Sequence, residues 1–417
     1  MNAIFVFIFT DGQDFMLTNI EIEGFRSLRH VEVDLPGLTV FIGPNGSGKS
    51  NLLDAFALMA EAATGRLGEG IAKRSGISTL LFRGENKIFF GFEFAPEGDF
   101  LRESAPVHYK LQLRPLGALP FVWFEQVYKD PVPPHTNPLY LMHRDKQRPM
   151  TMFRSLVTGL KQELDLQEQL EQAEGKEIES QSELAIFQVK DQTAYPTPYK
   201  LLRQFENWSF YAPIRVELDA PIRSPQLARP GLRLFPDGSN LSSVLQALQS
   251  QYPAIWDEIA EILKNVYDDF RYLSFPAEGG DGKILLRWWE HPFEKDHGFS
   301  ANLLSDGTLR LLSLLAILKT PDPPPLICID EPEIGLHPSW IRLLAELLES
   351  AATRTQLIVT THSPELVSHV KADHVVVVEK EEGATILSRL TNNELADWLD
   401  KFRLGDLWLA GHIGGRP

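Results

Sequence analysis

Cysteine is nearly absent from this sequence: Cys328 is the one cysteine among 417 residues. A single thiol excludes an intrachain disulfide framework and a cysteine-based metal cluster. We therefore expect a reducing, cytoplasmic setting. The apolar stretch at residues 3–9 is too short for a membrane span, and it lacks the basic region and the cleavage site of a signal peptide. No membrane partner is expected, and residues 1–15 are interpreted as an extension before the first clear strand pattern, which begins after Met16.

Positive charge is also in short supply. The chain has 40 Lys and Arg against 56 Asp and Glu, a formal net charge of −16. This balance argues against a basic surface over the whole chain for binding nucleic acid, although a local basic patch stays compatible with it. Hydrophobic residues make up 43% of the sequence, which indicates a globular protein with a substantial core in one large or two ordinary domains.

A glycine-rich motif, GPNGSGKS, occupies residues 43–50 between an apolar run and an amphipathic stretch. The pattern G-x-x-x-x-G-K-S in a strand–loop–helix context predicts a phosphate-binding loop. Lys49 would lie against the β- and γ-phosphates of a nucleotide, and the Ser50 hydroxyl would reach Mg²⁺. Alone, the pattern also fits an ordinary glycine-rich turn. The predicted nucleotide-binding residues are Gly43, Pro44, Asn45, Gly46, Ser47, Gly48, Lys49, Ser50 and Asn51.

Two apolar runs in the C-terminal third end in polar residues. The segment LICIDEPE predicts a buried strand that ends at Asp330 and Glu331, and LIVTTHSP predicts another that ends before His362. An acid at the carboxyl edge of a parallel sheet can hold Mg²⁺, and the next carboxylate can polarise an attacking water. We therefore assign Asp330 to the metal and Glu331 to catalysis. A histidine at a strand end is more often structural, but its place after the acidic strand favours a role in sensing the γ-phosphate.

A second glycine-bearing motif, LLSDGTLR, lies at residues 303–310 before a long apolar helix pattern. Ser305 predicts an N-cap, and Gly307 permits a close backbone approach. A helix N-terminus with free N–H groups and a hydroxyl is an anion site, although a simple capped helix explains the same residues. In this sequence order, the expected anion is a γ-phosphate next to Ser305, Asp306 and Gly307.

The remaining chain predicts an α/β protein with four parts. They are the extension (1–15), an N-terminal lobe with antiparallel β-structure (16–130), a helical and irregular lid insertion (131–235) and a C-terminal lobe (236–417). Charged residues mostly free of helix breakers predict a helix over residues 153–187, interrupted near Gly175. The basic residues at 223–233 fit phosphate contact or a solvated loop equally well.

The order GPNGSGKS, LLSDGT, CIDEPE-x-GLHP, TTHS resembles ABC-type ATPases of the RecF and SMC kind, above all the small stand-alone RecF-like ATPases of bacteria. IEGFRSL at 22–28, DGSNL at 237–241 and LGDLWLAGHIGG at 404–415 are similar to further segments of that group. The resemblance implies a P-loop fold with a mixed central sheet and a head built from both ends of the chain. It also implies a homodimer that closes around two ATP molecules, in which Ser305, Asp306 and Gly307 face the phosphate loop of the other copy.

By the same resemblance, ATP and Mg²⁺ are the cofactors, His362 is a switch residue, and Gln188 is a candidate third contact for Mg²⁺. The reading LSDGT, in place of the LSGGQ usual in transporters, disfavours an ABC transporter subunit. An ATP-dependent binding module with little turnover remains an alternative to an ATPase that acts on DNA or on a partner effector in genome maintenance or phage defence. Only about 55 residues follow His362, too few for the nuclease domain of related ATPases, so a nuclease-like effector is expected to be a separate protein.

Overall fold

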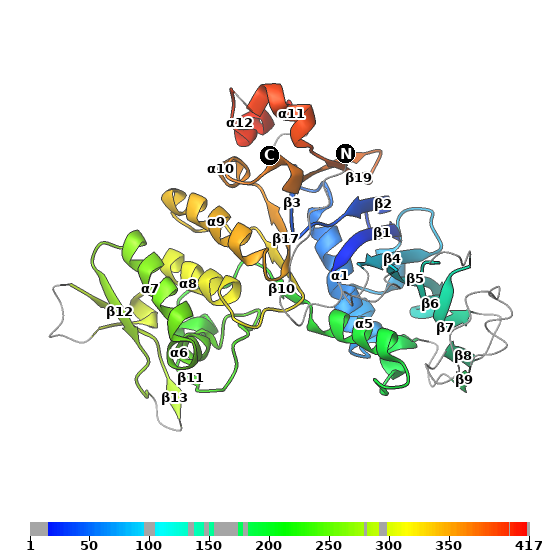
Figure 1. The fold of residues 1–417 in the computed structure, drawn as a ribbon, viewed down its shortest axis with the longest axis horizontal. Helices are drawn as coiled ribbons and strands as arrows, with labels where there is room; N and C mark the ends of the chain where they lie inside the picture. Colours follow the sequence, from blue (N-terminus) through cyan, green and yellow to red (C-terminus); the bar gives the residue numbers. More distant parts are fainter. Residues whose placement is uncertain are drawn as a thin grey trace.

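The structure is a computed structural model that describes residues 16–95, 105–131, 137–145, 150–153, 174–177, 182–278, 282–291, 298–399 and 401–414. Two large sheets and the helices between and beside them make up most of it (Figure 1). The extension predicted at residues 1–15 lies outside the described residues.

A six-stranded sheet forms the centre of the molecule, with the strand order β10–β16–β17–β3–β18–β19. Its first five strands are parallel, and β19 pairs antiparallel with β18. The runs LICID, QLIVTT and VVVV are mostly apolar and almost wholly buried, as expected for strands that are covered on both faces. The strands are β3 (Leu38–Ile42), β10 (Ser209–Tyr211), β16 (Leu326–Asp330), β17 (Gln356–Thr361), β18 (Val375–Glu381) and β19 (Ala384–Arg389).

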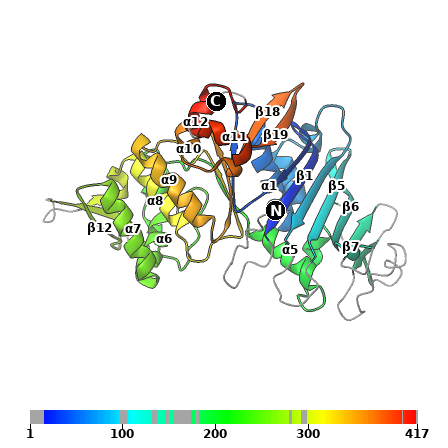
Figure 2. The ribbon, with the colours of Figure 1, turned by 45° about the horizontal axis from the view of Figure 1, so that its top comes forward.

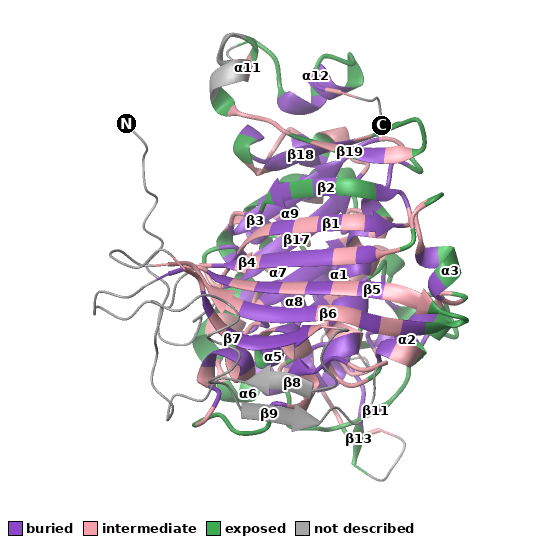
Figure 3. Cartoon of the chain, turned by 90° about the vertical axis from the view of Figure 1, so that its right-hand side faces the viewer, coloured by how far each residue is buried: buried purple, intermediate pink, exposed green. Residues whose placement is uncertain are grey.

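An eight-stranded antiparallel sheet lies to one side, with the order β2–β1–β4–β5–β6–β7–β8–β9. Buried and partly exposed residues alternate along its strands, because one face packs on the core and the other faces outward (Figure 3). The strands are β1 (Leu17–Phe25), β2 (Leu28–Asp34), β4 (Ile88–Phe94), β5 (Val107–Leu116), β6 (Leu119–Lys129), β7 (Leu139–Asp145), β8 (Met150–Phe153) and β9 (Glu174–Glu177).

Helices cover both faces of the central sheet. On the side of the antiparallel sheet lie α1 (Lys49–Ala63) and α5 (Pro196–Asn207), and on the opposite side lie α8 (Asp306–Leu318) and α9 (Ile341–Ala351) (Figures 1 and 2). Side chains alternate between the two cores along β16: Ile327 and Ile329 pack with α8 and α9, whereas Leu326 and Cys328 pack with α1. The sheet therefore separates two hydrophobic cores and connects them through one backbone.

Smaller elements complete the two sides. Beside α8 lie two small antiparallel sheets, β11–β13 and β12–β14–β15, and the helix pair α6 and α7. The remaining elements are α2 (Leu67–Lys73), α3 (Ile77–Leu80), α6 (Leu241–Gln251), α7 (Pro253–Val266), α10 (Pro364–Val367), α11 (Asn392–Leu399), α12 (Leu404–Leu409), β11 (Gln226–Leu227), β12 (Phe270–Ser274), β13 (Lys283–Ile284), β14 (Arg287–Glu290) and β15 (Phe299–Ser300). Within the described ranges, no helix combines the length and the apolarity that crossing a membrane requires.

Part of the expectation for residues 131–235 was wrong. The antiparallel sheet does not end at residue 130, since β7, β8 and β9 extend it into the segment assigned to the insertion. The helix expected over 153–187 is replaced by strand at residues 174–177, and residues 154–173 lie outside the described ones. Charged residues without breakers suit a solvated helix and the outer strands of a sheet alike, so composition did not separate the two.

Candidate functional site

The phosphate loop joins β3 to α1 and is fixed by contacts with β18 and β19. Gly43 has a φ of 152°, and a Cβ there would lie 2.1 Å from the Val378 carbonyl oxygen. Gly48 has a φ of 119°, and a Cβ there would lie 2.1 Å from Oγ1 of Thr385. Both positions require glycine, because atoms of β18 and β19 lie too close to leave room for a Cβ.

Lys49 begins α1 but directs its amine back over the loop. Its Nζ donates hydrogen bonds to the carbonyl oxygens of Gly43 at 2.8 Å and Pro44 at 3.1 Å. Burial lowers the pKa of Lys49 to about 8, and the nearby carboxylates of Glu331 and Asp330 oppose that shift. The amine is therefore mostly charged at pH 7 and lies in a place where a bound anion would stabilise it further.

The two acids predicted from LICIDEPE lie where β16 ends, two strands from β3. Asp330 accepts a hydrogen bond from Oγ1 of Thr360 on β17. Glu331 has a φ of 48°, a left-handed conformation that is uncommon outside glycine, and its N–H donates to the Thr360 carbonyl oxygen at 2.9 Å. The strained residue is thus held by the neighbouring strand.

His362 follows β17 and meets Glu331, with 3.6 Å between Nε2 and Oε1. Burial and the charge of Lys49 lower its pKa, so the ring is neutral at pH 7. Its backbone N–H donates to Oε1 of Glu333 at 3.1 Å, and Thr361 donates its hydroxyl to the same oxygen. Burial raises the pKa of Glu333. Lys49, Glu331 and His362 therefore converge at the carboxyl edge of the parallel sheet.

The residues assigned to Mg²⁺ can be tested by the chemistry of the space between them. Ser50 and Asp330 both line a cavity of about 170 Å³ at the start of α1. A hydroxyl and a carboxylate are oxygen donors of the kind that Mg²⁺ prefers, usually with several waters. The pair therefore fits a Mg²⁺ bound through few protein ligands, while Gln188 does not line that cavity.

Gln188 lies in a short helix, η2 (Ile186–Gln188), that packs against α1. This segment is held by Glu125 of β6, which is fully buried and accepts hydrogen bonds from the N–H groups of Ala185 at 2.6 Å and Ile186 at 3.0 Å. The amide nitrogen of Gln188 is buried, and within the described residues it has no hydrogen-bond partner. This nitrogen is a hydrogen-bond donor, so a contact of Gln188 with Mg²⁺ would have to use the amide oxygen instead.

The second glycine motif caps α8, and its polar residues face outward. Oγ of Ser305 accepts a hydrogen bond from the N–H of Thr308 at 3.1 Å, and Ser305 and Asp306 are exposed. A Cβ on Gly307 would lie 3.0 Å from the Gly335 carbonyl oxygen, so the loop after Glu331 packs closely on this turn. Within the chain, α8 and α1 lie on opposite sides of the central sheet (Figure 1). Ser305, Asp306 and Gly307 line neither of the cavities that border Ser50 and Asn51.

A larger cavity of about 1060 Å³ opens beside Asn51, between the β1–β2 turn and the β18–β19 hairpin. Charged side chains of both signs line it, Arg26, Arg29, Arg83 and Lys380 with Glu85, Glu381 and Glu382, together with the apolar Leu81 and Phe82. Asn51 donates its amide N–H to Oγ of Ser27 at 2.7 Å, which ties the start of α1 to the β1–β2 turn. The cavity therefore begins where the phosphate loop ends.

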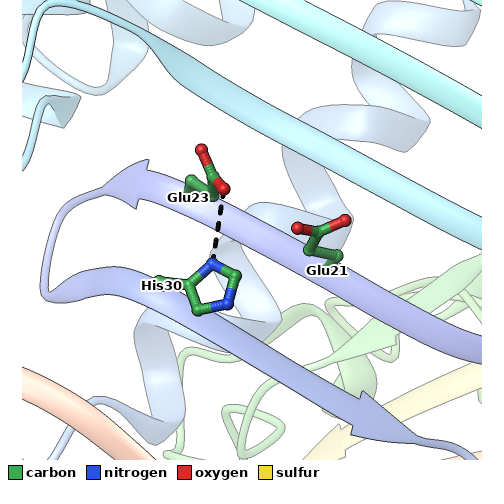
Figure 4. A group of neighbouring side chains, drawn as sticks. All are labelled: Glu21, Glu23 and His30. Carbon is green, nitrogen blue, oxygen red and sulfur yellow. Dashed lines mark ion pairs between the residues drawn. The ribbon is translucent and has the colours of Figure 1, made fainter.

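A different group of metal-type ligands lies on the outer face of the antiparallel sheet. Glu21 and Glu23 from β1 lie beside His30 from β2, and 3.4 Å separate Nδ1 of His30 from Glu23 (Figure 4). Lys87 already pairs with Glu23 at 2.7 Å. A surface ion-pair cluster accounts for the group.

Two family models match parts of this chain. Residues 16–94 match the family model described as "AAA ATPase domain", and residues 198–368 match "AAA domain, putative AbiEii toxin, Type IV TA system". The first match contains the phosphate loop, and the second contains Ser305, Asp330, Glu331 and His362.

Two solved structures share the fold over nearly the whole chain. An SmcHead bound to the C-winged helix domain of ScpA aligns with a TM-score of 0.53 and 16% identity over 91% of this chain and 99% of its own. An Smc head domain with an extended coiled coil, bound to the C-terminal domain of ScpA and derived from Pyrococcus furiosus, gives 0.54 and 14% over 93% and 99%. The chain is similar to RecF and SMC proteins and has the fold of an SMC head domain. The predicted family resemblance and fold class are thereby confirmed.

The sequence relatives of this RecF/SMC-like chain match over short segments. The DNA replication and repair protein RecF of Streptomyces avermitilis is 44% identical over 52 residues, 12% of this chain and 14% of RecF. The chromosome partition protein Smc of Methanocaldococcus jannaschii is 49% identical over 41 residues, 10% of this chain and 4% of Smc. The Septu protein PtuA of Bacillus thuringiensis is 32% identical over 76 residues, 18% of this chain and 19% of PtuA. The matches thus span less than a fifth of each relative.

The roles of three residues in and around the candidate site were not predicted from the sequence. Glu333 is the third acid of DEPE, and its position two residues after Glu331 was the available signal. Glu125 carries no local signal, since one acid within a strand pattern is ordinary. Arg223 was read as a phosphate contact or part of a solvated loop, and both interpretations were wrong for this residue, because it is 3% exposed and bonded within the protein.

Proposed function

We propose that this chain is an ATPase whose two copies close head to head around two ATP molecules and reopen after hydrolysis. The observation that carries the proposal is the convergence of Lys49, Asp330, Glu331 and His362 at one edge of the parallel sheet, with Ser305 exposed on the other side. Two copies that face each other would bring Ser305 of one copy against the phosphate loop of the other, which accounts for both observations.

Each residue has a role that its surroundings support. Lys49 and the N–H groups of residues 45–50 bind the phosphates, while Ser50 and Asp330 hold Mg²⁺, which neutralises the phosphate oxygens when bound. Glu331 accepts a hydrogen bond from the attacking water and orients it. The ring of His362 lies 3.6 Å from Glu331. From there it hydrogen-bonds to the γ-phosphate next to the attacking water.

The nucleoside end of ATP fits the 1060 Å³ cavity beside Asn51. Phe82 and Leu81 supply apolar surface for a base, and Arg26 supplies a planar cation that can stack on it. The pocket also lies next to the loop that would hold the phosphates, so one ligand can occupy both. Gln188 is proposed as an additional contact near Mg²⁺.

The dimer is tested with Glu331→Gln, which removes the base but keeps the shape of the side chain. Light scattering with ATP and Mg²⁺ should then give a mass near twice 47.1 kDa. Lys49→Ala, which cannot bind the phosphates, is the matched control and should stay monomeric. A Glu331→Gln variant that binds ATP yet remains monomeric would overturn the proposed closure.

Turnover separates an ATPase from a binding module. Wild-type protein should release phosphate at least 100-fold faster than Glu331→Gln, a difference of about 2.7 kcal/mol in barrier. Equal rates would leave an ATP-dependent binding module instead. Because one matched relative is named as a DNA replication and repair protein, the first target to test is double-stranded DNA ends. No stimulation by DNA would favour a separate protein effector.

A further inference from the structure

Arg223 makes an unusual set of contacts just before α8. It ends a short helix, η3 (Pro221–Arg223), and its side chain is 4% exposed. Nε donates to the carbonyl oxygen of Val216 at 2.6 Å. Nη1 lies 3.0, 3.2 and 2.8 Å from the carbonyl oxygens of Ala301, Asn302 and Leu304, and Nη2 lies 2.7 Å from Oδ1 of Asp306.

Three of these acceptors, the carbonyl oxygens of Ala301, Asn302 and Leu304, belong to one short stretch of backbone. Residues 301–304 include the 3-10 turn η4 (Ala301–Leu303), and Ser305 and Asp306 follow it as the N-cap and first residue of α8. Carbonyl groups before a helix have no partners in that helix and need others when they are buried. Arg223 supplies those partners from a segment about 80 residues earlier in the chain.

Only an arginine can make this set of bonds. The guanidinium carries five N–H donors in a rigid planar fork, so contacts to several carbonyls fix the loop in position and in angle. Lysine has donors at one atom on a flexible stem, and glutamine has two donors and a shorter reach. Neither can hold Val216, the 301–304 carbonyls and Asp306 at once.

We propose that Arg223 is a positioning residue that holds Ser305, Asp306 and Gly307 ready for the nucleotide of a second copy. The proposal rests on the head-to-head dimer proposed above. A loop that is already ordered loses little conformational entropy when the copies dock. The two copies therefore bind each other more tightly than they would with a disordered loop. Arg223 itself touches no nucleotide.

The test uses Arg223→Lys and Arg223→Gln, each made in the Glu331→Gln background. Binding of ATP to the monomer should change less than twofold, because the phosphate loop lies on the other side of the sheet. The dissociation constant of the ATP-bound dimer should rise at least tenfold. Arg215→Ala is the matched control: Arg215 lies in the same segment, is 66% exposed and pairs with the side chains of Glu217 and Asp219, so its loss should leave the dimer unchanged.

The outcomes separate this inference from the proposed function. If Glu331→Gln alone does not dimerise, the proposed function fails. If it dimerises and the Arg223 variants dimerise equally well, the positioning role is overturned while the function stands. If both variants unfold, amide exchange in the wild-type monomer decides. Slow exchange at Ala301, Leu304 and Thr308, whose N–H groups are all hydrogen-bonded, supports the inference, and exchange at the rate of an unstructured peptide overturns it.

Discussion

Glu125 and Arg223 lie on opposite sides of the central sheet, and each holds a backbone segment by a buried charge. Glu125 accepts hydrogen bonds from the N–H groups before Gln188, whereas Arg223 donates to the carbonyl groups before α8. The difference lies in what balances each charge. Arg144, 3% exposed, lies 3.9 Å from Glu125, while Asp306, the ionic partner of Arg223, is 60% exposed.

This contrast indicates two uses of the same device. The contacts of Glu125 with Tyr109 and Arg144 lie inside the core, so their loss should mainly affect folding. The contacts of Arg223 end at an exposed carboxylate, so their loss should mainly affect what that surface binds. Three predictions can break or sharpen the comparison.

Glu125→Ala should have the largest effect on stability. It removes a fully buried carboxylate that lies beside Arg144, and it takes away the acceptor of the N–H groups of Ala185 and Ile186, which costs about 3–5 kcal/mol. Denaturant unfolding measures the loss. Glu32→Ala on the exposed side of β2 is the control and should change the free energy of unfolding by less than about 0.5 kcal/mol. If both variants lost a similar free energy of unfolding, Glu125 would be no more important for stability than an exposed acid, and the comparison with Arg223 would fail.

Gly335→Ala should have an intermediate effect. Gly335 has a φ of 72°, and a Cβ there would lie 1.6 Å from Nη1 of Arg310 on α8. The left-handed conformation alone costs about 1–2 kcal/mol, and displacing Arg310 adds to it. Gly383→Ala, with a φ of 88° and nothing within 4 Å, isolates the conformational part. If both variants lost the same free energy of unfolding, Arg310 would be free to move aside, and its position on α8 would not be fixed by packing.

Asp306→Asn should have the smallest effect on stability. Because the carboxylate is 60% exposed, its ion pair with Arg223 is screened by solvent and contributes at most about 1 kcal/mol. Thermal unfolding should therefore shift by only a few degrees. A loss as large as that of Glu125→Ala would show that both charges are structural and that the comparison fails.

Sequence patterns predicted the parts of the site that lie at strand ends. An apolar strand followed by GPNGSGKS, DEPE or TTH marks the carboxyl edge of a parallel sheet, and the structure brings Lys49, Glu331 and His362 together there. Local signals work at this edge because neighbouring parallel strands end side by side. The fold class was readable for the same reason.

The supporting contacts could not be predicted, because they depend on pairs that are distant in the sequence. Glu125 meets Ile186 across 61 positions, and Arg223 meets Leu304 across 81. No local pattern distinguishes these residues from a solvated acid or a basic loop. The strand at residues 174–177 was missed because its pairing with β8, and not its composition, defines it.

The strand order also determines when the ATP site can fold during translation. β3, near the N-terminus, pairs on one side with β17 and on the other with β18. More than 300 residues separate Ile42 from Gln356, and translation of that stretch takes roughly 15–60 s at typical rates. During that interval the phosphate loop emerges without either neighbouring strand. The nascent chain should therefore acquire its ATP site only near the end of translation, and a ribosome-bound chain stopped before β17 should bind no nucleotide.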